Sequence, residues 1–114
     1  MRLIREIPAE LQGYSNAELR SLLGELEYRV NQVAILGTDA KVCAIVVSPD
    51  DPQGDDIGAL HCVFYRRENQ MFVTSFNEHG KFEIDGKALK EAQITRRTRQ
   101  IRFGELRFRI MIER

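Results

Sequence analysis

The sequence predicts an all-β fold, a sandwich or a barrel, with one amphipathic helix added near its N-terminus. Short apolar-alternating runs and frequent turn residues support this class. Phe82 and Ile84 alternate with charged residues before Asp85-Gly86, a pair typical of a two-residue hairpin turn. Residues 106–112 again place apolar side chains at every second position, as in a strand with one buried face. Short strands separated by so many turns favour a sandwich or a barrel.

The N-terminal segment predicts one short strand followed by the helix. Residues 2–7 form the candidate strand, which Pro8 ends. Ser15 and Glu18 have the spacing of a capping box, in which each side chain satisfies a backbone N–H at the helix start. The helix is therefore expected to begin at about Asn16.

The end of the helix is harder to predict. Leucine and valine residues recur at steps of three and four from Leu19 to Val33, which indicates a helix to at least Glu27. Beyond Glu27 the apolar residues also alternate, as they would in a strand. A full helix over 16–33 would instead give an α+β domain, in which that helix packs against a single sheet.

The middle of the chain predicts more strands. The nearly continuous apolar run 42–47 is typical of a central strand that is covered on both faces. Residues 48–54 form an exposed, turn-rich loop. Runs 61–65 and 71–75 have hairpin spacing, and 90–99 is expected to be a long polar connection.

Length and charge set limits on the kind of protein. The 114 residues suit a single domain over 1–114, with 1–33 as an N-terminal strand and helix extension and 34–114 as the sandwich. The formal net charge is zero, from 17 basic and 17 acidic residues, which argues against general polyanion binding. No apolar run approaches a membrane span and no signal peptide is recognisable, so membrane insertion is not expected.

No catalytic or metal-binding motif stands out. Cys43 and Cys62 are expected to be buried free thiols in a reducing cytoplasm. Cys62 adjoins His61, but neighbouring strand residues point to opposite faces and cannot act as a nucleophile and base pair. The acidic run 50–56 lacks the ligand spacing of a calcium loop. We therefore expect no enzyme, no cofactor and no metal site.

Short motifs follow one another in a characteristic order. They are Leu36-Gly37, Gly58-Ala59-Leu60-His61, Asn77-Glu78-His79-Gly80, Asp85-Gly86 and Ile101-Arg102-Phe103-Gly104. In order and spacing they resemble the forkhead-associated (FHA) domain family, a two-sheet β-sandwich that binds phosphothreonine peptides through loops at one end. The resemblance implies a cytoplasmic protein-interaction module, a signalling or assembly scaffold of the kind found in larger bacterial assemblies.

The same resemblance implies which residues meet the partner. The peptide-binding positions are Thr38, Gly58, His61, Asn77 and His79, with His61 mostly bracing the recognition loop. The family's phosphate-binding arginine falls on Thr38 and its phosphate-binding serine falls on Gly58. A phosphate needs charge-assisted donors, and neither residue supplies one. We therefore expect a partner protein or peptide that is recognised without phosphate, or with only weak binding of phosphothreonine.

Arginines offer an alternative anion site. Arg66, Arg67, Arg96, Arg97 and Arg99 could replace the missing arginine, or they could belong to solvated loops that protect a sheet edge. The alternative function is anion or nucleic-acid binding through the arginine-rich segment 96–109. Nucleic acid is the less expected partner, because strand periodicity directs Phe103 and Phe108 into the core and away from bases.

Overall fold

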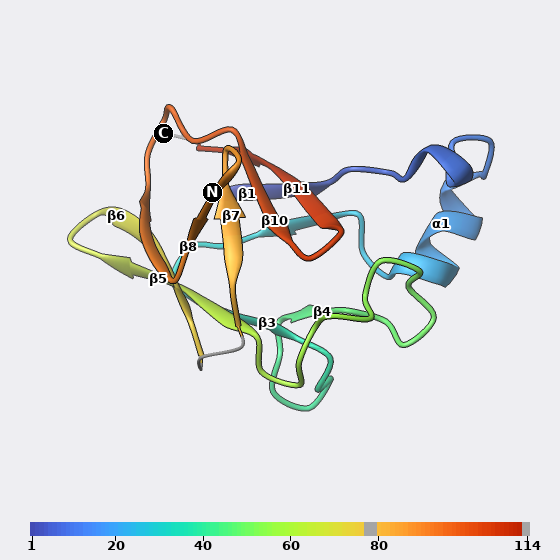
Figure 1. Cartoon of the computed structure of the whole chain (residues 1–114), viewed down its shortest axis with the longest axis horizontal. Coiled ribbons are helices and arrows are strands. Elements are labelled where there is room, and N and C mark those ends of the chain that lie inside the picture. Colours follow the sequence, from blue (N-terminus) through green and yellow to red (C-terminus); the bar gives the residue numbers. More distant parts are fainter. Residues whose placement is uncertain (77–79, 113–114) are drawn as a thin grey trace.

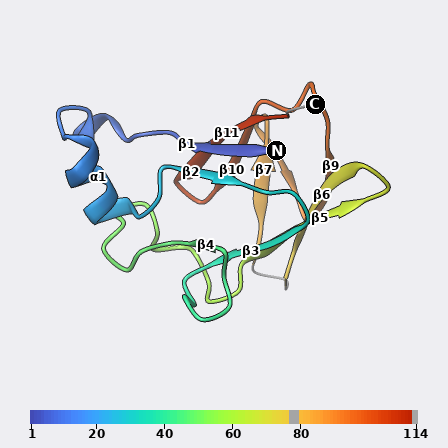
Figure 2. The same cartoon turned by 180° about the vertical axis from the view of Figure 1, so that it is seen from behind.

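The chain folds as two β-sheets packed face to face, with a short helix at one side (Figures 1 and 2). The structure is a computed structural model that describes residues 1–76 and 80–112. Its helical elements are η1 (Ala9–Leu11, a 3-10 helix) and α1 (Asn16–Leu23). Its strands are β1 (Arg2–Arg5), β2 (Glu27–Arg29), β3 (Val33–Gly37), β4 (Ile45–Val46), β5 (Cys62–Arg67), β6 (Gln70–Ser75), β7 (Phe82–Ile84), β8 (Lys87–Leu89), β9 (Glu91–Ile94), β10 (Gln100–Phe103) and β11 (Leu106–Met111).

The six-stranded sheet has the order β2-β1-β11-β10-β7-β8, and the five-stranded sheet has the order β4-β3-β5-β6-β9. The strand pairs are antiparallel apart from the short parallel pair of β3 with β4. This arrangement confirms the predicted all-β sandwich with an added N-terminal helix, and the α+β alternative is wrong. β1 and β2 belong to the six-stranded sheet. The segment before residue 34 therefore contributes strands to the sandwich as well as the helix.

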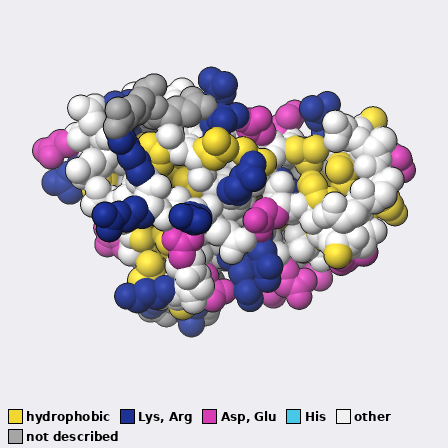
Figure 3. All heavy atoms as spheres, turned by 90° about the horizontal axis from the view of Figure 1, so that it is seen from above, with side chains coloured by type: hydrophobic (Ala, Val, Ile, Leu, Met, Phe, Trp, Pro, Cys, Tyr) yellow, Lys and Arg dark blue, Asp and Glu magenta, His cyan; other side chains and the backbone are white. Residues whose placement is uncertain are grey.

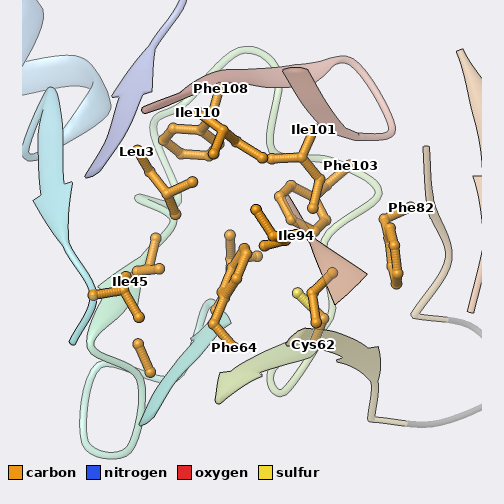
Figure 4. Packing of buried hydrophobic residues seen from close by; sticks show 14 of the residues in the cluster. Leu3, Ile45, Cys62, Phe64, Phe82, Ile94, Ile101, Phe103, Phe108 and Ile110 are labelled. Carbon is orange, nitrogen blue, oxygen red and sulfur yellow. The ribbon is translucent and has the colours of Figure 1, made fainter. Parts of the chain in front are cut away.

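The core lies between the two sheets and is rich in aromatic rings (Figure 4). Along β11 buried and exposed residues alternate strictly, as the sequence pattern predicts. Phe103 is central, because its ring lies 6.3 Å from the ring of Phe64 on the opposite sheet and 6.4 Å from that of Phe108. Such edge-to-face pairs add about 0.5–1.5 kcal/mol each beyond the burial of their area.

The helix begins as predicted and ends earlier. Ser15 and Glu18 form the full capping box. The helix stops at Leu23, because Gly24 takes a φ of 80°, a left-handed conformation that ends helices. The prediction that the helix reaches Glu27 is therefore wrong. Residues 27–29 form β2 instead, and Val30 is buried in the main core.

The apolar face of α1 packs away from the main core. Leu19 and Leu23 join Leu11 in a small separate cluster. Figure 3 shows hydrophobic side chains on the lobe at the right, which is the side where α1 lies in Figure 1. No helix among the described residues is long and apolar enough to cross a membrane.

Two strand predictions need correction. The apolar run 42–47 does not form a central strand, because only Ile45–Val46 pairs, at the edge of the five-stranded sheet. Cys43 is buried within a turn, where its N–H donates to the Asp39 carbonyl, so its apolar character does not reflect a strand. The segment 90–99 is not wholly a connection, since Glu91–Ile94 pairs with β6 as an edge strand.

A buried ion pair ties the loop after β4 to the six-stranded sheet. Arg5 projects from β1 and donates from both terminal nitrogens to Asp51, over 2.7 Å and 3.0 Å. Arg5 is 6% exposed and Asp51 is 3% exposed. The same guanidinium donates to Gln53 and lies over the ring of Phe108. Loop 48–54 was predicted to be an exposed turn, but its central aspartate is one of the most buried charged groups of the domain.

Replacing Asp51 by alanine should destabilise the domain by about 3–5 kcal/mol, because Arg5 would be left as a buried charge without its partner. Asp50→Ala is the matched control. Asp50 is exposed, and its removal should change the free energy of unfolding by about 0.5 kcal/mol or less. Urea unfolding of both variants measures the difference. Equal stabilities of the two variants would show that the ion pair does not hold the loop.

Candidate functional site at the apex of the sandwich

One end of the sandwich is built around residues 58–61, which we call the apex seam. The seam runs beside the end of β3 and the turn that follows it. Thr38 N–H donates to the Gly58 carbonyl over 3.1 Å, and Asp39 N–H donates to the Ala59 carbonyl over 3.2 Å. Because these backbone groups are satisfied by one another, the turn and the seam form a single unit.

The other side of the seam meets the loop after β6. His61 N–H donates to the Leu36 carbonyl over 2.9 Å, while its own carbonyl accepts from Phe76 N–H over 3.1 Å. Ser75 Oγ donates to the Gly80 carbonyl, which joins the end of β6 to Gly80. The seam is therefore held from both flanks.

Two glycines make this packing sterically possible. A Cβ at Gly37 would lie 2.1 Å from the Ala59 carbonyl oxygen, and a Cβ at Gly80 would lie 2.1 Å from the His61 carbonyl oxygen. Real Cβ atoms do not approach oxygen so closely, so any side chain at either position would push the seam away. Glycine is required at positions 37 and 80, because the backbone of another segment approaches each position too closely for a side chain.

His61 fastens the seam through its ring. Nδ1 accepts from the Gly58 N–H over 3.3 Å, and Nε2 lies 3.1 Å from the Lys81 carbonyl oxygen. A carbonyl can only accept, so these partners assign the Nε2–H tautomer. The ring is buried and meets the edge of Phe103 at 5.8 Å between centroids. His61 thus braces the apex from below.

The structure brings together Thr38, Gly58 and His61, the described members of the predicted peptide-binding set. Thr38 and Gly58 are exposed and hydrogen-bonded to each other through their backbones, whereas His61 is buried beneath them. Asn77 and His79, the other two predicted positions, lie outside the described residues.

A pocket of about 300 Å³ opens beside the seam. Its described lining is Asp55, Asp56, Ile57, Gly58, Leu60, His61 and Gly80, which includes two carboxylates and no lysine or arginine. Asp56 packs against the turn between β10 and β11, since a Cβ at Gly104 would lie 3.3 Å from its Oδ2. The carboxylates of Asp55 and Asp56 are therefore the charged groups of its described lining. The acidic run 50–56 was visible in the sequence, but its place at the apex was not.

The predicted anion-binding arginines do not reach the apex. Arg67 pairs with Gln70 at one end of the β5–β6 hairpin, and Cys62 pairs with Ser75 at the other end, beside His61. The structure therefore places the arginines of β5 away from Thr38, and anion binding by the set stays a prediction. Two residues of the set, Arg66 and Arg96, line one pocket at the opposite end. The other three, Arg67, Arg97 and Arg99, do not line that pocket. The backbone N–H of Arg99 donates to the Asp85 carboxylate.

The thiols are poorly suited to nucleophilic chemistry. Burial is the main cause that raises the pKa of the Cys62 thiol far above its ordinary value, with a smaller contribution from Cys43. Burial also raises the pKa of Cys43. Both cysteines are free and buried, as predicted. Among the described residues no group of His, Cys, Asp and Glu side chains could hold a metal ion.

Comparison with known proteins identifies the fold. No family model and no curated protein matches the sequence significantly. Solved structures do match. One, from a structural and functional analysis of phosphothreonine-dependent FHA domain interactions, has a TM-score of 0.68 at 13% identity over 99% of this chain and 96% of that one. The FHA domain of the CT664 protein of Chlamydia trachomatis gives 0.66 at 14% identity over 100% of both chains.

A third similar structure is the cytoplasmic domain of PscD, a type III secretion sorting platform protein of P. aeruginosa. It has a TM-score of 0.57 at 22% identity over 77% of this chain and 71% of that one. The protein described here therefore has the FHA fold, as its sequence motifs predict, although its sequence has diverged far from these structures.

Gly37→Ala should destabilise the domain by about 1–3 kcal/mol, because the new methyl group would collide with the Ala59 carbonyl. Gly58→Ala is the matched control. No atom lies within 4 Å of a Cβ built at Gly58, so this change should alter stability by about 1 kcal/mol or less. Chemical denaturation measures both. If Gly37→Ala is as stable as Gly58→Ala, the close packing of the seam is not what holds the apex.

Proposed function

We propose that this FHA-fold domain is a non-enzymatic protein-interaction module that presents its apex to a partner protein or peptide without depending on phosphate. The main observation that supports this proposal is the chemistry of the apex. The frame of the recognition loops is tightly built, yet the two positions where the family has its phosphate donors hold Thr38 and Gly58. Such a frame supports loop-mediated recognition, while its exposed groups do not favour a dianion.

The charges beside the apex seam also argue against phosphate binding. Asp55 and Asp56 line the apex pocket, so a phosphate there would meet like charges and no charged donor among the described lining residues. Like-charge juxtaposition at an interface costs several kcal/mol. Hydrogen bonds to charged groups contribute roughly 1.5–3 kcal/mol each. Loss of an arginine and a serine would therefore lower phosphothreonine affinity by ~100-fold or more.

The similar structures support an interaction role of either kind. One comes from work on phosphothreonine-dependent interactions, and another belongs to a type III secretion sorting platform. We place this domain with the assembly type, as a cytoplasmic component of a bacterial complex, because its apex lacks the charged donors that phosphate-dependent recognition requires.

Nucleic-acid binding through the segment 96–109 is the weaker candidate. Phe103 and Phe108 are fully packed in the core and cannot stack on bases. The arginines of the segment are also divided between the loop before β10 and the outer face of β10 and β11. Arg102 and Arg107 line one pocket, whereas Arg96 lines another.

The proposed function predicts that the unmodified domain binds phosphothreonine peptides no better than the unphosphorylated peptides. The double variant Thr38→Arg, Gly58→Ser should gain phosphate-dependent binding, because the frame is in place and the two side chains add a charged donor and a hydroxyl donor. Gly58 has no positive φ and has open space around its Cβ position, so serine fits there. Calorimetric titration of both proteins with a phosphothreonine peptide library measures the gain.

A second variant, Thr38→Gln, Gly58→Ala, controls for changes in the loops that add no charge. It should bind phosphorylated peptides no better than the unphosphorylated ones. Micromolar, phosphate-dependent binding by the unmodified domain would contradict the proposed function and show that other groups supply the phosphate contacts.

A further inference from the structure

A pocket with a basic lining lies at the end of the domain opposite the apex. This basal pocket, of about 560 Å³, lies between the β5–β6 turn, the end of β9 and the start of β1. The polar residues that line it are Asn31, Arg66, Asn69, Gln70, Gln93, Thr95 and Arg96. Buried Met71 and Ile94 are part of its apolar floor. None of the described residues that line it carries a carboxylate, whereas the apex pocket has two.

Arg66 is held at the rim by its neighbour across the turn. Its Nη2 donates to Asn69 Oδ1 over 2.6 Å. Asn69 takes a φ of 65°, and Glu68 before it takes 52°, so the two residues form the tight turn that brings the Asn69 side chain back over β5. Because the amide oxygen of Asn69 already accepts, its NH₂ group and the remaining Arg66 N–H groups stay available as donors.

Arg96 faces the same pocket from a rigid turn. Thr95 N–H donates to Thr98 Oγ1 over 3.0 Å, and Thr98 N–H returns a bond to the Thr95 carbonyl over 3.0 Å. These bonds fix the backbone on both sides of Arg96. The Arg96 side chain forms no hydrogen bond or ion pair with any part of the chain that the structure describes. Figure 3 shows lysine and arginine side chains beside hydrophobic ones on the face seen from above.

We propose that the basal pocket binds an acidic peptide segment of a partner protein, as a second interaction site independent of the apex. One carboxylate would lie between the guanidinium groups of Arg66 and Arg96, whose planar donor arrays match carboxylate geometry. A neighbouring aliphatic side chain would cover the floor at Met71 and Ile94. No aromatic residue is among the described lining residues, so the pocket offers no platform for a nucleobase.

The edge position of β9 suits an extended peptide. β9 ends the five-stranded sheet, and its Gln93 and Ile94 line the pocket. Exposed edge strands can pair with an added strand, which is a common way to bind a peptide. The pocket would then supply the side-chain selectivity, through its charge and its apolar floor.

The test is an NMR titration of the full chain with the peptide acetyl-Glu-Leu-Glu-Ile-amide. The amide signals of Asn69, Thr95 and Arg96 should shift, and those of the apex seam should not. The peptide with Gln in place of Glu should bind at least ~10-fold more weakly, since each charge-assisted hydrogen bond contributes that much or more. Equal binding of the two peptides would overturn the proposal.

Single-residue variants distinguish a specific binding site from unspecific electrostatic attraction. Arg66→Gln and Arg96→Gln should each weaken binding by ~10-fold or more. Arg67→Gln and Arg97→Gln remove adjacent arginines that do not line the pocket, so they should change affinity by about twofold or less. Equal losses from all four variants would overturn the proposal, because they would indicate unspecific electrostatic binding.

Two further probes decide the class of ligand. Inorganic phosphate and a single-stranded oligonucleotide should each bind more weakly than the acidic peptide. Tighter binding of phosphate would overturn the peptide assignment in favour of a free anion, and tighter binding of the oligonucleotide would overturn it in favour of nucleic acid. Failure at this pocket leaves the apex unaffected, since the two sites share no residue.

Discussion

The domain depends on a close approach of backbones at its apex. The Ala59 and His61 carbonyl oxygens occupy the space that side chains would need at Gly37 and Gly80. This approach lets the seam satisfy its hydrogen bonds with β3 on one side and with the loop after β6 on the other. The ring of His61 then joins the seam to the backbone of Lys81 and to the aromatic core. The position of every described apex group follows from this arrangement.

The described linings of the pockets at the two ends of the sandwich carry opposite charges, although the net charge of the chain is zero. At the apex, Asp55 and Asp56 line a pocket that has no described cation, and buried Asp51 fastens the loop that carries them to Arg5. At the base, arginines and amides surround an apolar floor. Under the two proposals made above, the domain would use chemically different ends for two partners, as an assembly scaffold would.

Much of the β-sandwich could be predicted from the sequence, because its turns and its helix start depend on residues that are close together in the chain. The hairpin at Asp85-Gly86 and the capping box at Ser15 depend on residues close in sequence, and both are present. The helix was predicted too long because Val30 has helical spacing but packs in the sandwich core. The Arg5–Asp51 pair joins residues 46 positions apart, and no local pattern indicates it. The same holds for the division of arginines and aspartates between the two ends, which only the strand register determines.

A crystal structure determined in concentrated sulfate would test the central claim most directly. We predict that no ordered sulfate is held by Thr38 and Gly58, because the apex frame offers neutral groups there and carboxylates beside them. The seam, the close backbone approaches at Gly37 and Gly80, and the contacts of the His61 ring with Gly58 and Lys81 should be preserved. An ordered sulfate bound by the Thr38 hydroxyl and the exposed backbone at Gly58 would contradict the account, because it would show that this apex still forms an oxyanion site.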